Sequence, residues 1–275
     1  MNNSIFAGIV TFNPDISRLK ENINSIFNQV DKIVIVDNHS NNLAEIMELC
    51  KKFNIVLITF SDNLGIATAL NKIMNYALEA GVKYVLTLDQ DSICPKNMIA
   101  NLSKHFKDDV AIVCPYIHDL NSNNDISNRK TQNVDRCITS GALTSVDSWK
   151  KIDGFDEYMF IDGVDFDFCD RLKNAGFSII RCADVVLEHE IGKISIRKFL
   201  WFDVCVRNHS AFRKYYIARN IIYLDKKNHY KFYPIKTILR EIKLILIVIL
   251  YEEDKKNKLK LILDGIKDGF EHKIK

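Results

Sequence analysis

The sequence lacks the features that would place the protein across a membrane or outside the cell. No apolar run reaches the ~18 residues that a helix needs to span a bilayer. The N-terminus, Met1-Asn2-Asn3-Ser4, has neither the charged segment nor the long apolar segment of a secretory signal. The seven cysteines include no C-x-x-C pair, which argues against a zinc site or a disulfide framework. We therefore expect a cytoplasmic protein in a reducing compartment.

Two further absences narrow the class of ligand. A formal net charge of +3 on 275 residues is too small to indicate a nucleic-acid partner. No G-x-G-x-x-G motif follows the first apolar strand, so the dinucleotide-binding fingerprint is missing. Hydrophobic residues make up 47% of the chain and charged residues 27%, which is typical of a folded protein.

The first half of the chain alternates apolar strands with amphipathic helices. Strands are expected at 5–12, 33–36, 55–60, 84–88 and 110–114, and helices at 16–27, 43–53, 63–80 and 95–106. Strands that are nearly continuous Val, Ile and Leu, separated by helices, indicate a mostly parallel sheet covered on both faces. We expect an α/β fold with a Rossmann-like doubly wound half.

The pattern changes after a polar segment at 121–133, which predicts a loop. The elements expected beyond it are a helix at 164–175 and strands at 179–182 and 185–187. From about Ser195 the chain is basic and aromatic, and we expect it to be helical to the end.

Two carboxylates stand where the fourth expected strand ends. Asp89 and Asp91 are spaced i and i+2, so their side chains point to the same side of an extended chain. Open α/β sheets bind ligands at this edge, and oxygen ligands suit Mg²⁺ or Mn²⁺. We predict a site for one of these cations. Acidic pairs in solvated loops are the alternative.

Other polar residues follow neighbouring strands. Asp37 ends the second expected strand, and Asp62 and Asn63 follow the third. Asp and Asn favour turns, which explains any one of these positions but explains three coincident strand ends less well. We expect these side chains to line one crevice with the acidic pair.

A second acidic cluster runs from Asp162 to Asp170, where four of nine residues are Asp. A carboxylate of this cluster could act as a general base for a hydroxyl group. Alternatively, Asp162 caps a helix while Asp165 and Asp167 stabilise its positive first turn. The two readings are compatible.

The sequence leaves the roles of two more features open. For His189 the alternatives are a third metal ligand, a phosphate contact and a structural residue. For the basic and aromatic run from Arg213 to Asn220 they are a site for a phosphate or a lipid headgroup, and a solvated helix face.

In combination, these motifs resemble glycosyltransferase family 2. The matching segments, in chain order, are Gly8–Pro14, Val36–Ser40, Asn63–Asn71, Leu88–Ser92, Thr139–Gly141, Gly154–Glu157 and Asp165–Gly176. Leu88-Asp89-Gln90-Asp91-Ser92 is similar to the form of the D-x-D motif in rhamnosyltransferases. Tyr215–Asn220 resembles a late motif of the same branch.

The resemblance implies a GT-A fold: a domain at 1–192, with a nucleotide-sugar half at about 1–115 and an acceptor half at 135–192, and a helical extension at 193–275. The site residues that it implies are Thr11, Asn13, Asp37, Asn63, Asp89 and Arg219 for the nucleotide sugar, Asp89, Asp91 and His189 for the metal, and Asp165 for catalysis.

The assignment of the base follows from Arg171. The family usually has a Glu-Asp pair before the helix that carries its Arg, and counting back from Arg171 places Val164-Asp165 there. The Glu is therefore missing, and Asp165 falls on the base position with Asp162 as the alternative. The implied mechanism is inverting displacement at the anomeric carbon, in which Asp165 deprotonates the acceptor hydroxyl.

The resemblance favours transfer of rhamnose from dTDP-rhamnose to a glycan or lipid-linked acceptor in bacterial surface polysaccharide synthesis. The alternatives are a family 2 enzyme that uses a UDP-sugar, and a catalytically silent GT-A scaffold. Retention of both D-x-D aspartates and of Asp165 argues against silence, and the missing Glu argues for it.

The C-terminal segment Ile242–Tyr251 has nine apolar residues of ten. Basic residues accompany it: Lys226, Lys227, Lys231, Lys236, Arg240, Lys243, Lys255, Lys256, Lys258 and Lys260. We expect this C-terminal segment to make peripheral contact with the anionic inner face of the cell membrane. A buried packing helix or a dimer interface explains the apolar run equally well.

Overall fold

A computed structural model describes residues 4–119, 128–189, 195–199, 202–227 and 234–274. The chain divides into two compact units. The first consists of Met1–Phe160 and Val164–Glu190, and the second of Ile161–Gly163 and Ile191–Lys275. Most of the expected loop at 121–133 lies outside the described residues.

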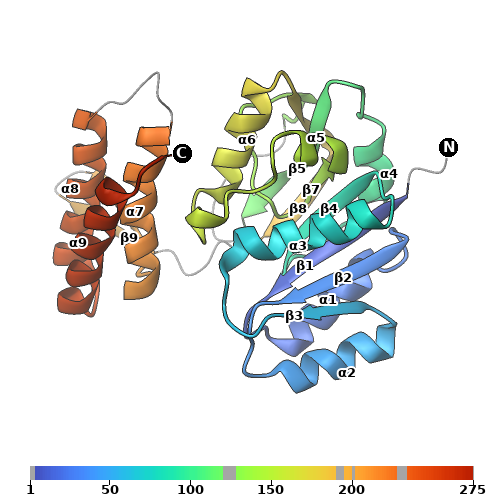
Figure 1. Ribbon diagram of the computed structural model, residues 1–275, viewed down its shortest axis with the longest axis horizontal. Helices are drawn as coiled ribbons and strands as arrows, with labels where there is room; N and C mark the ends of the chain where they lie inside the picture. Colours follow the sequence, from blue (N-terminus) through green and yellow to red (C-terminus); the bar gives the residue numbers. More distant parts are fainter. Residues whose placement is uncertain (1–3, 120–127, 190–194, 200–201, 228–233, 275) are drawn as a thin grey trace. The chain divides into compact units, whose positions relative to one another are not determined.

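The first unit is built on an eight-stranded sheet with the order β3-β2-β1-β4-β7-β5-β8-β6 (Figure 1). The strands are β1 (Ile5–Thr11), β2 (Lys32–Asp37), β3 (Val56–Thr59), β4 (Tyr84–Asp89), β5 (Val110–Asp119), β6 (Gln132–Asn133), β7 (Ala142–Ser145) and β8 (Ser178–His189). β7 is antiparallel to β4 and β5, and β6 is antiparallel to β8, whereas the other pairs are parallel. The expectation of a mostly parallel α/β sheet is confirmed.

Helices cover both faces of this sheet (Figure 1). The helices are α1 (Ile16–Ile26), α2 (Leu43–Phe53), α3 (Gly65–Glu79), α4 (Met98–Ser103), α5 (Val146–Lys151) and α6 (Val164–Asn174), with a 3₁₀ turn, η1 (Glu157–Met159). Alternate residues of β1, such as Ala7 and Ile9, share a core with Leu19 of α1. Gly8 faces the other side, where a Cβ atom would lie 2.3 Å from Cγ2 of Ile73 in α3. Only glycine therefore lets α3 pack so closely on β1.

The sequence and the structure differ in several boundaries of this unit. The two brief strands expected at 179–182 and 185–187 form one strand, β8, whose register against β5 shifts between Pro115 and Tyr116. The irregularity interrupts the period-two pattern, which is why the sequence suggests two segments. The helix expected at 95–106 is shorter in the structure, since α4 covers Met98–Ser103.

The second unit contains a hairpin and three helices. The hairpin consists of β9 (Ser195–Phe199) and β10 (Phe202–Val206), which pair in antiparallel fashion. The prediction that the chain is helical from Ser195 is therefore wrong for this segment. Phe202, Val204 and Val206 alternate with other residues at the period of a strand, a signal that the basic composition obscured.

The helices of the second unit are α7 (Ala211–Lys227), α8 (Pro234–Tyr251) and α9 (Lys255–Glu271). Ala218, Val248 and Ile262, one from each helix, form their shared core. α7 and α9 approach closely, because a Cβ atom at Gly265 would lie 2.3 Å from the backbone oxygen of Tyr215. Beside this core, the Glu252 carboxylate accepts hydrogen bonds from Lys214 at 2.6 Å and Lys258 at 3.0 Å.

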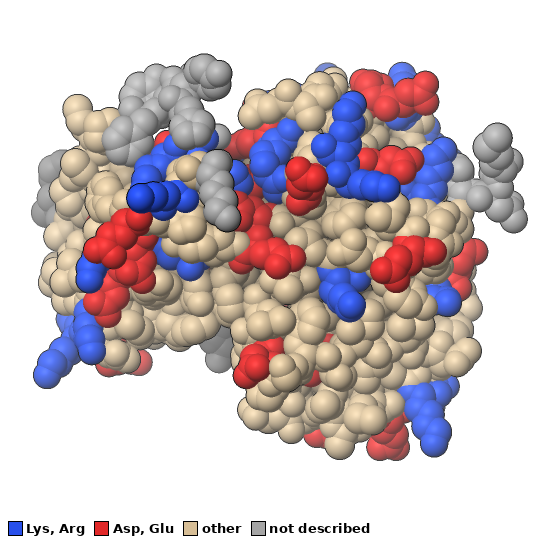
Figure 2. All heavy atoms as spheres, in the orientation of Figure 1, with Lys and Arg blue, Asp and Glu red and all other residues tan. Residues whose placement is uncertain are grey.

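Charges of both signs occur on the surface. Figure 2 shows Lys and Arg side chains interspersed with Asp and Glu side chains over the face that it displays. None of the described helices combines the length and the apolarity that are needed to cross a membrane. The surface of α8 differs from this mixed pattern, because its exposed charged residues, Lys236, Arg240 and Lys243, are all basic.

Glu241 is a buried carboxyl group on the bundle-facing side of α8. Within the described part of the chain, neither of its carboxylate oxygens has a hydrogen-bond partner. Burial raises the pKa of Glu241 to about 8, because the charged form cannot be solvated there. The folded protein therefore keeps a proton that the unfolded chain releases near its ordinary pKa of ~4.3.

We expect Glu241→Gln to remove part of the pH dependence of stability. Since the folded pKa is raised, the contribution of Glu241 is fully present below the unfolded pKa and is lost as pH rises through about 8. At pH 9 the Gln variant should be more stable than the wild type by about 1–3 kcal/mol, and at pH 4 the two should agree. Denaturant unfolding at both pH values, with exposed Glu253→Gln as the control, measures the difference. Parallel pH profiles for all three proteins would contradict the prediction.

Candidate functional site

The pairing register brings the carboxyl ends of four parallel strands to one edge of the sheet. Thr11 of β1 is opposite Asp37 of β2, which is opposite Thr59 of β3. On the other side of β1, Val10 is opposite Asp89 of β4. The polar residues at these strand ends therefore lie along one edge of the sheet, where open α/β sheets bind ligands, and their lining of one crevice stays a prediction.

Asp37 is the hydrogen-bonding centre of this edge, and it is fully buried. Its Oδ1 accepts from the Thr11 hydroxyl at 2.9 Å and from the Ser40 hydroxyl at 2.5 Å, and its Oδ2 accepts from the Ser40 N–H at 2.9 Å. The Ser40 hydroxyl in turn accepts from the N–H of Asn13 at 2.8 Å. Asp37 and the buried Thr11 thus hold the ends of β1 and β2 together, whereas Asn13 is exposed. The nucleotide contact of Asp37 stays a prediction.

A pair of amides fixes the start of α3. Asn38 donates through Nδ2 to Oδ1 of Asn63 at 2.9 Å and accepts through Oδ1 from the N–H of Leu64 at 2.8 Å. Gly65 has a φ of +86°, and a Cβ atom there would lie 2.6 Å from the ring of Phe160. The N–H of Ile66 donates to the carbonyl of Phe160 at 2.7 Å. The half-buried Asn63 is therefore held at the edge from both sides.

The backbone of Asp89 is held by two side chains. Its carbonyl accepts from Nδ2 of Asn22 at 2.6 Å, and its N–H donates to the Ser140 hydroxyl at 3.3 Å. The hydroxyls of Ser140 and Ser92 are 2.6 Å apart, so they share a hydrogen bond. The strand end that carries the first aspartate is thereby fixed to α1 and to the segment before β7.

The next two residues of the same motif are also tied down. Oε1 of Gln90 accepts from the N–H of Phe12 at 2.9 Å, which joins the ends of β1 and β4. Nε of Arg18 donates to the carbonyl of Asp91 at 2.8 Å. Because the bond from Arg18 uses the backbone carbonyl of Asp91, the Asp91 carboxylate stays available: no described residue bonds it.

Asp89 and Asp91 fit a hard divalent cation. Both side chains are partly exposed at the edge of the sheet, and both offer oxygen atoms on a backbone that is already ordered. His189, the third predicted ligand, is the last residue of β8, and its side chain lies outside the described part of the structure.

In the acidic cluster, Asp162, Asp167 and Asp170 each hold an arginine. Asp162 accepts from Nε and Nη2 of Arg213 at 2.9 and 2.7 Å, within the second unit. In the first unit Asp167 accepts from Nε of Arg171 at 2.7 Å. Asp170 likewise forms an ion pair with Arg136.

The fourth aspartate, Asp165, lies in the first turn of α6 and lines a small cavity of about 10 Å³. Thr87 and Thr139 line the same cavity. Thr87 is two residues before Asp89, and Thr139 precedes the serine that bonds the Asp89 N–H. Asp165 is therefore near the end of β4, as a general base for this site would need to be.

Arg219 lies in α7 of the second unit and is buried. Its Nε and Nη2 donate to Oδ1 of Asn220 at 3.1 and 3.0 Å, and its guanidinium lies 4.7 Å from the ring centre of Tyr216. Asn220 donates to the carbonyls of Ile161 and Asp162 at 2.8 and 2.9 Å. These contacts are all within the second unit, and the predicted nucleotide contact of Arg219 stays a prediction.

Sequence reasoning missed Asn22, although a signal for it exists. In α1 it occupies a fully buried position together with Leu19, Ile23 and Ile26. A polar residue on the apolar face of a helix needs a hydrogen-bond partner, which indicates a structural or functional contact. Asn71 in α3 shows the same signal, since its amide bonds Phe155 at 2.8 and 2.9 Å.

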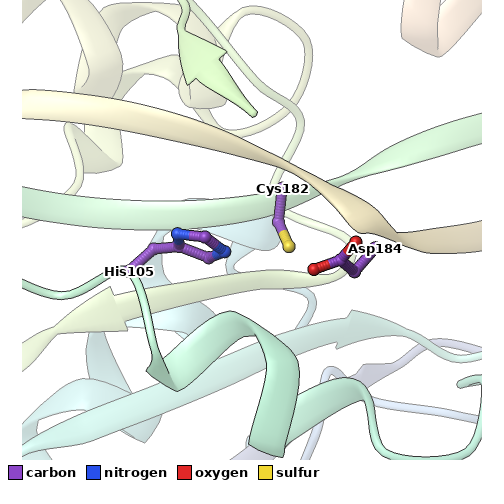
Figure 3. Close-up of side chains that lie close together, drawn as sticks. All are labelled: His105, Cys182 and Asp184. Atoms are coloured by element: carbon purple, nitrogen blue, oxygen red, sulfur yellow. The ribbon is translucent and has the colours of Figure 1, made fainter. Parts of the chain in front are cut away.

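A separate group of potential metal ligands lies elsewhere in the first unit. His105 follows α4, and Cys182 and Asp184 come from β8; their ligand atoms all lie within 4.8 Å of one another (Figure 3). A thiol and an imidazole would suit Zn²⁺ better than Mg²⁺. However, burial raises the pKa of the Cys182 thiol, which disfavours the thiolate that metal binding requires. We assign no metal to this group.

Comparisons with known proteins agree with this geometry. A model of the family "Glycosyl transferase family 2" matches residues 7–172, which is more than half of the 275-residue chain. The chain is 31% identical to the dTDP-rhamnosyl transferase RfbF of Shigella flexneri, with 97% of each chain covered.

Solved structures share the fold. A mannosyltransferase of Pyrobaculum calidifontis in complex with GDP-Man and Mn²⁺ matches with a TM-score of 0.59 at 15% identity, covering 98% of this chain and 76% of that one. Residues 1–349 of S. aureus TarS match with a TM-score of 0.56 at 13% identity, covering 97% and 72%. The GT-A fold expected from the sequence is thereby confirmed. With its family model and a relative aligned along nearly its whole length, the chain belongs to glycosyl transferase family 2.

Proposed function

We propose that the protein is an inverting, metal-dependent rhamnosyltransferase that transfers rhamnose from dTDP-rhamnose to a glycan or lipid-linked acceptor in bacterial surface polysaccharide synthesis. The observation that carries the proposal is the 31% identity to a dTDP-rhamnosyl transferase over 97% of both chains. The ordered Asp-Gln-Asp-Ser loop at the end of β4 supports it. We place the activity in the cytoplasm, where nucleotide sugars are the donors.

The nucleotide-side residues divide into two groups by exposure. Asn13, Asn63 and Asp89 lie at the surface of the edge, and we propose that they contact the nucleotide sugar. Thr11 and Asp37 are fully buried and already hydrogen-bonded to each other, so we propose that they position the edge from behind. Asp37 then acts through Ser40 and Asn13.

Asp89 and Asp91 would hold Mg²⁺ or Mn²⁺, which offsets the negative charge that grows on the leaving nucleoside diphosphate. The hard oxygen donors on a fixed backbone support this assignment. The Mn²⁺ in the complex of the mannosyltransferase that shares this fold is consistent with it.

Asp165 is the proposed general base. It lines the cavity beside Thr87, near the end of β4, where it could take the proton of the acceptor hydroxyl as that oxygen attacks the anomeric carbon. The alternative, Asp162, forms a two-point ion pair with Arg213, so both of its oxygens already face a guanidinium and not an acceptor hydroxyl. No covalent intermediate is required by this route.

The competing readings are a UDP-sugar donor and a silent scaffold. The fold is compatible with these two readings and with the proposed dTDP-rhamnose donor, since one fold hosts many substrates. Asp89, Asp91 and Asp165 are all retained, which favours an active enzyme. Contact of the C-terminal helices with a membrane is a separate proposal, because it depends on α8 and not on the nucleotide-side residues.

The donor is tested by comparing nucleotide sugars. We expect turnover with dTDP-rhamnose in the presence of Mn²⁺ and a larger rise in melting temperature than with UDP-glucose or UDP-GlcNAc. A ligand at 100 times its Kd stabilises a folded protein by about 2.7 kcal/mol, so the shifts should be measurable. dTDP-glucose separates recognition of the base from recognition of the sugar. Faster turnover with a UDP-sugar would reassign the donor, and no turnover with tight binding would favour the scaffold.

We expect Asp91→Asn to abolish the Mn²⁺-dependent part of dTDP binding without unfolding the protein. The Asp91 carbonyl, which Arg18 bonds, is retained, and only the carboxylate changes. Calorimetric titration of dTDP with and without Mn²⁺ measures the effect. Asp108→Asn, which changes an exposed carboxylate between α4 and β5, is the matched control. An unchanged Mn²⁺ dependence in Asp91→Asn would refute the metal assignment.

Asp165→Asn should retain donor binding and lose turnover by about 10² or more, the scale of a lost general base. Asp162→Asn should keep most of its turnover, because it alters an ion pair and not the base. Steady-state rates and dTDP affinity of the two variants decide between them. An inactive Asp162→Asn enzyme beside an active Asp165→Asn enzyme would reverse the assignment.

A further inference from the structure

The outer side of α8 is an exposed aliphatic face. Seven side chains on this helix are between 43% and 73% exposed: Ile235, Ile238, Leu239, Ile242, Leu246, Ile249 and Leu250. Their spacings of three, one and four residues place them on one side of an α-helix with 3.6 residues per turn. We call this set the α8 face.

The opposite side of α8 packs in the helical bundle. Thr237, Glu241 and Val248 are buried, and Val248 belongs to the core shared with α7 and α9. An ordinary surface helix turns its apolar side to the core and its polar side to water, whereas α8 has aliphatic residues on both. An exposed stripe of this size on a folded unit marks an interaction surface.

The structure refines the sequence expectation for the tail. The apolar run Ile242–Tyr251 does not act as one surface, because Leu244, Ile245 and Val248 pack toward the bundle. The exposed stripe instead begins earlier, at Ile235. One of the basic residues that accompany the run, Lys258, is buried against Glu252 and cannot serve a membrane.

A basic row borders the α8 face. Lys236, Arg240 and Lys243 are exposed and spaced i, i+4 and i+7, which places them along one edge of the stripe. Arg240 lies 3.4 Å from Asp225, but its side chain remains 59% exposed. The single acidic residue of α8, Glu241, is buried. By contrast, exposed positions of α9 carry both signs, as in the ion pair of Lys267 and Glu271.

We propose that the α8 face lies in the interface of an anionic membrane, with its aliphatic side chains at the acyl boundary and its basic row at the headgroup phosphates. A helix that is apolar on one long side and basic at its edge binds parallel to such a surface. The charge row favours lipid over a second copy of the chain. In a pair of copies, the basic rows would find no acidic partner on the exposed side of α8.

This inference is independent of the proposed donor, since it uses no residue of the nucleotide-side edge. If the intact chain transferred sugar normally in solution but did not bind membranes, the membrane inference would be overturned and the proposed function would stand. Membrane binding without sugar transfer would instead leave it standing and overturn the proposed function.

Co-sedimentation of the full chain with vesicles tests the proposal. The vesicles are phosphatidylcholine alone and phosphatidylcholine mixed with phosphatidylglycerol, each at low and high salt. We expect binding to the anionic vesicles only, and weaker binding as salt rises. Lys236→Gln with Lys243→Gln should lower the partition coefficient about fivefold for each lysine removed. Lys51→Gln with Lys52→Gln, two exposed lysines of α2, is the charge-matched control.

A second pair of variants tests the aliphatic part. Leu239→Asp, at a side chain that is 59% exposed, should lower binding by about tenfold or more, because it places a charge at the acyl boundary. Met47→Asp, at a residue of α2 that is 55% exposed, should bind as the wild type does. Circular dichroism checks that all variants are folded.

Three results would overturn the proposal. These are equal sedimentation with neutral and anionic vesicles, controls that lose as much binding as the α8 variants, and no binding by the intact chain. If light scattering showed a dimer that Leu239→Asp converts to a monomer, a second copy of the chain would be the occupant of the α8 face.

Discussion

The buried carboxylate of Asp37 is the interaction on which the candidate site depends. It accepts hydrogen bonds from Thr11, the last residue of β1, and from Ser40 in the loop after β2. A carboxyl group inside the protein must have such partners, because its desolvation would otherwise be too costly. Thr11 and Ser40 supply the hydrogen bonds that the buried carboxyl group needs, and the same bonds fix the positions of these two residues. This edge of the sheet is thus ordered by hydrogen bonds of its own.

The same logic extends along the edge to β3 and β4. Asn38 and Asn63 hold the start of α3, and Asn22 and Ser140 hold the backbone of Asp89. In each case a buried side chain or a bond to the backbone holds a residue whose own side chain is partly exposed, Asn63 or Asp89. Preorganisation of this kind lowers the cost of ordering side chains when a nucleotide binds.

The two units use their polar residues for different purposes. In the first unit, buried polar groups shape an edge that is open to ligands. In the second, Asn220 and Arg213 hold the short segment Ile161–Gly163, and the triad of Lys214, Glu252 and Lys258 lies inside the bundle. The aliphatic residues are also divided differently, since α8 leaves seven of them exposed although its core positions are filled.

The sequence by itself determined the alternation of strands and helices, the strand-end position of Asp89 and Asp91, and the family. These features are local: apolar periodicity and short motifs survive without knowledge of distant contacts. The edge shared by Asp37, Asn63 and Asp89 also followed, because parallel strands must end together.

Only the tertiary structure decided which residues face outward and which hold their neighbours. Asp37 and Asp89 look alike in the sequence, yet one is fully buried and the other is at the surface. Similarly, composition made Ser195–Val206 look helical, but cross-strand pairing makes it a hairpin. The division of Ile242–Tyr251 between a bundle core and an exposed face depends on where α7 and α9 lie. Burial and pairing of this kind come from residues far apart in the chain, which no local pattern records.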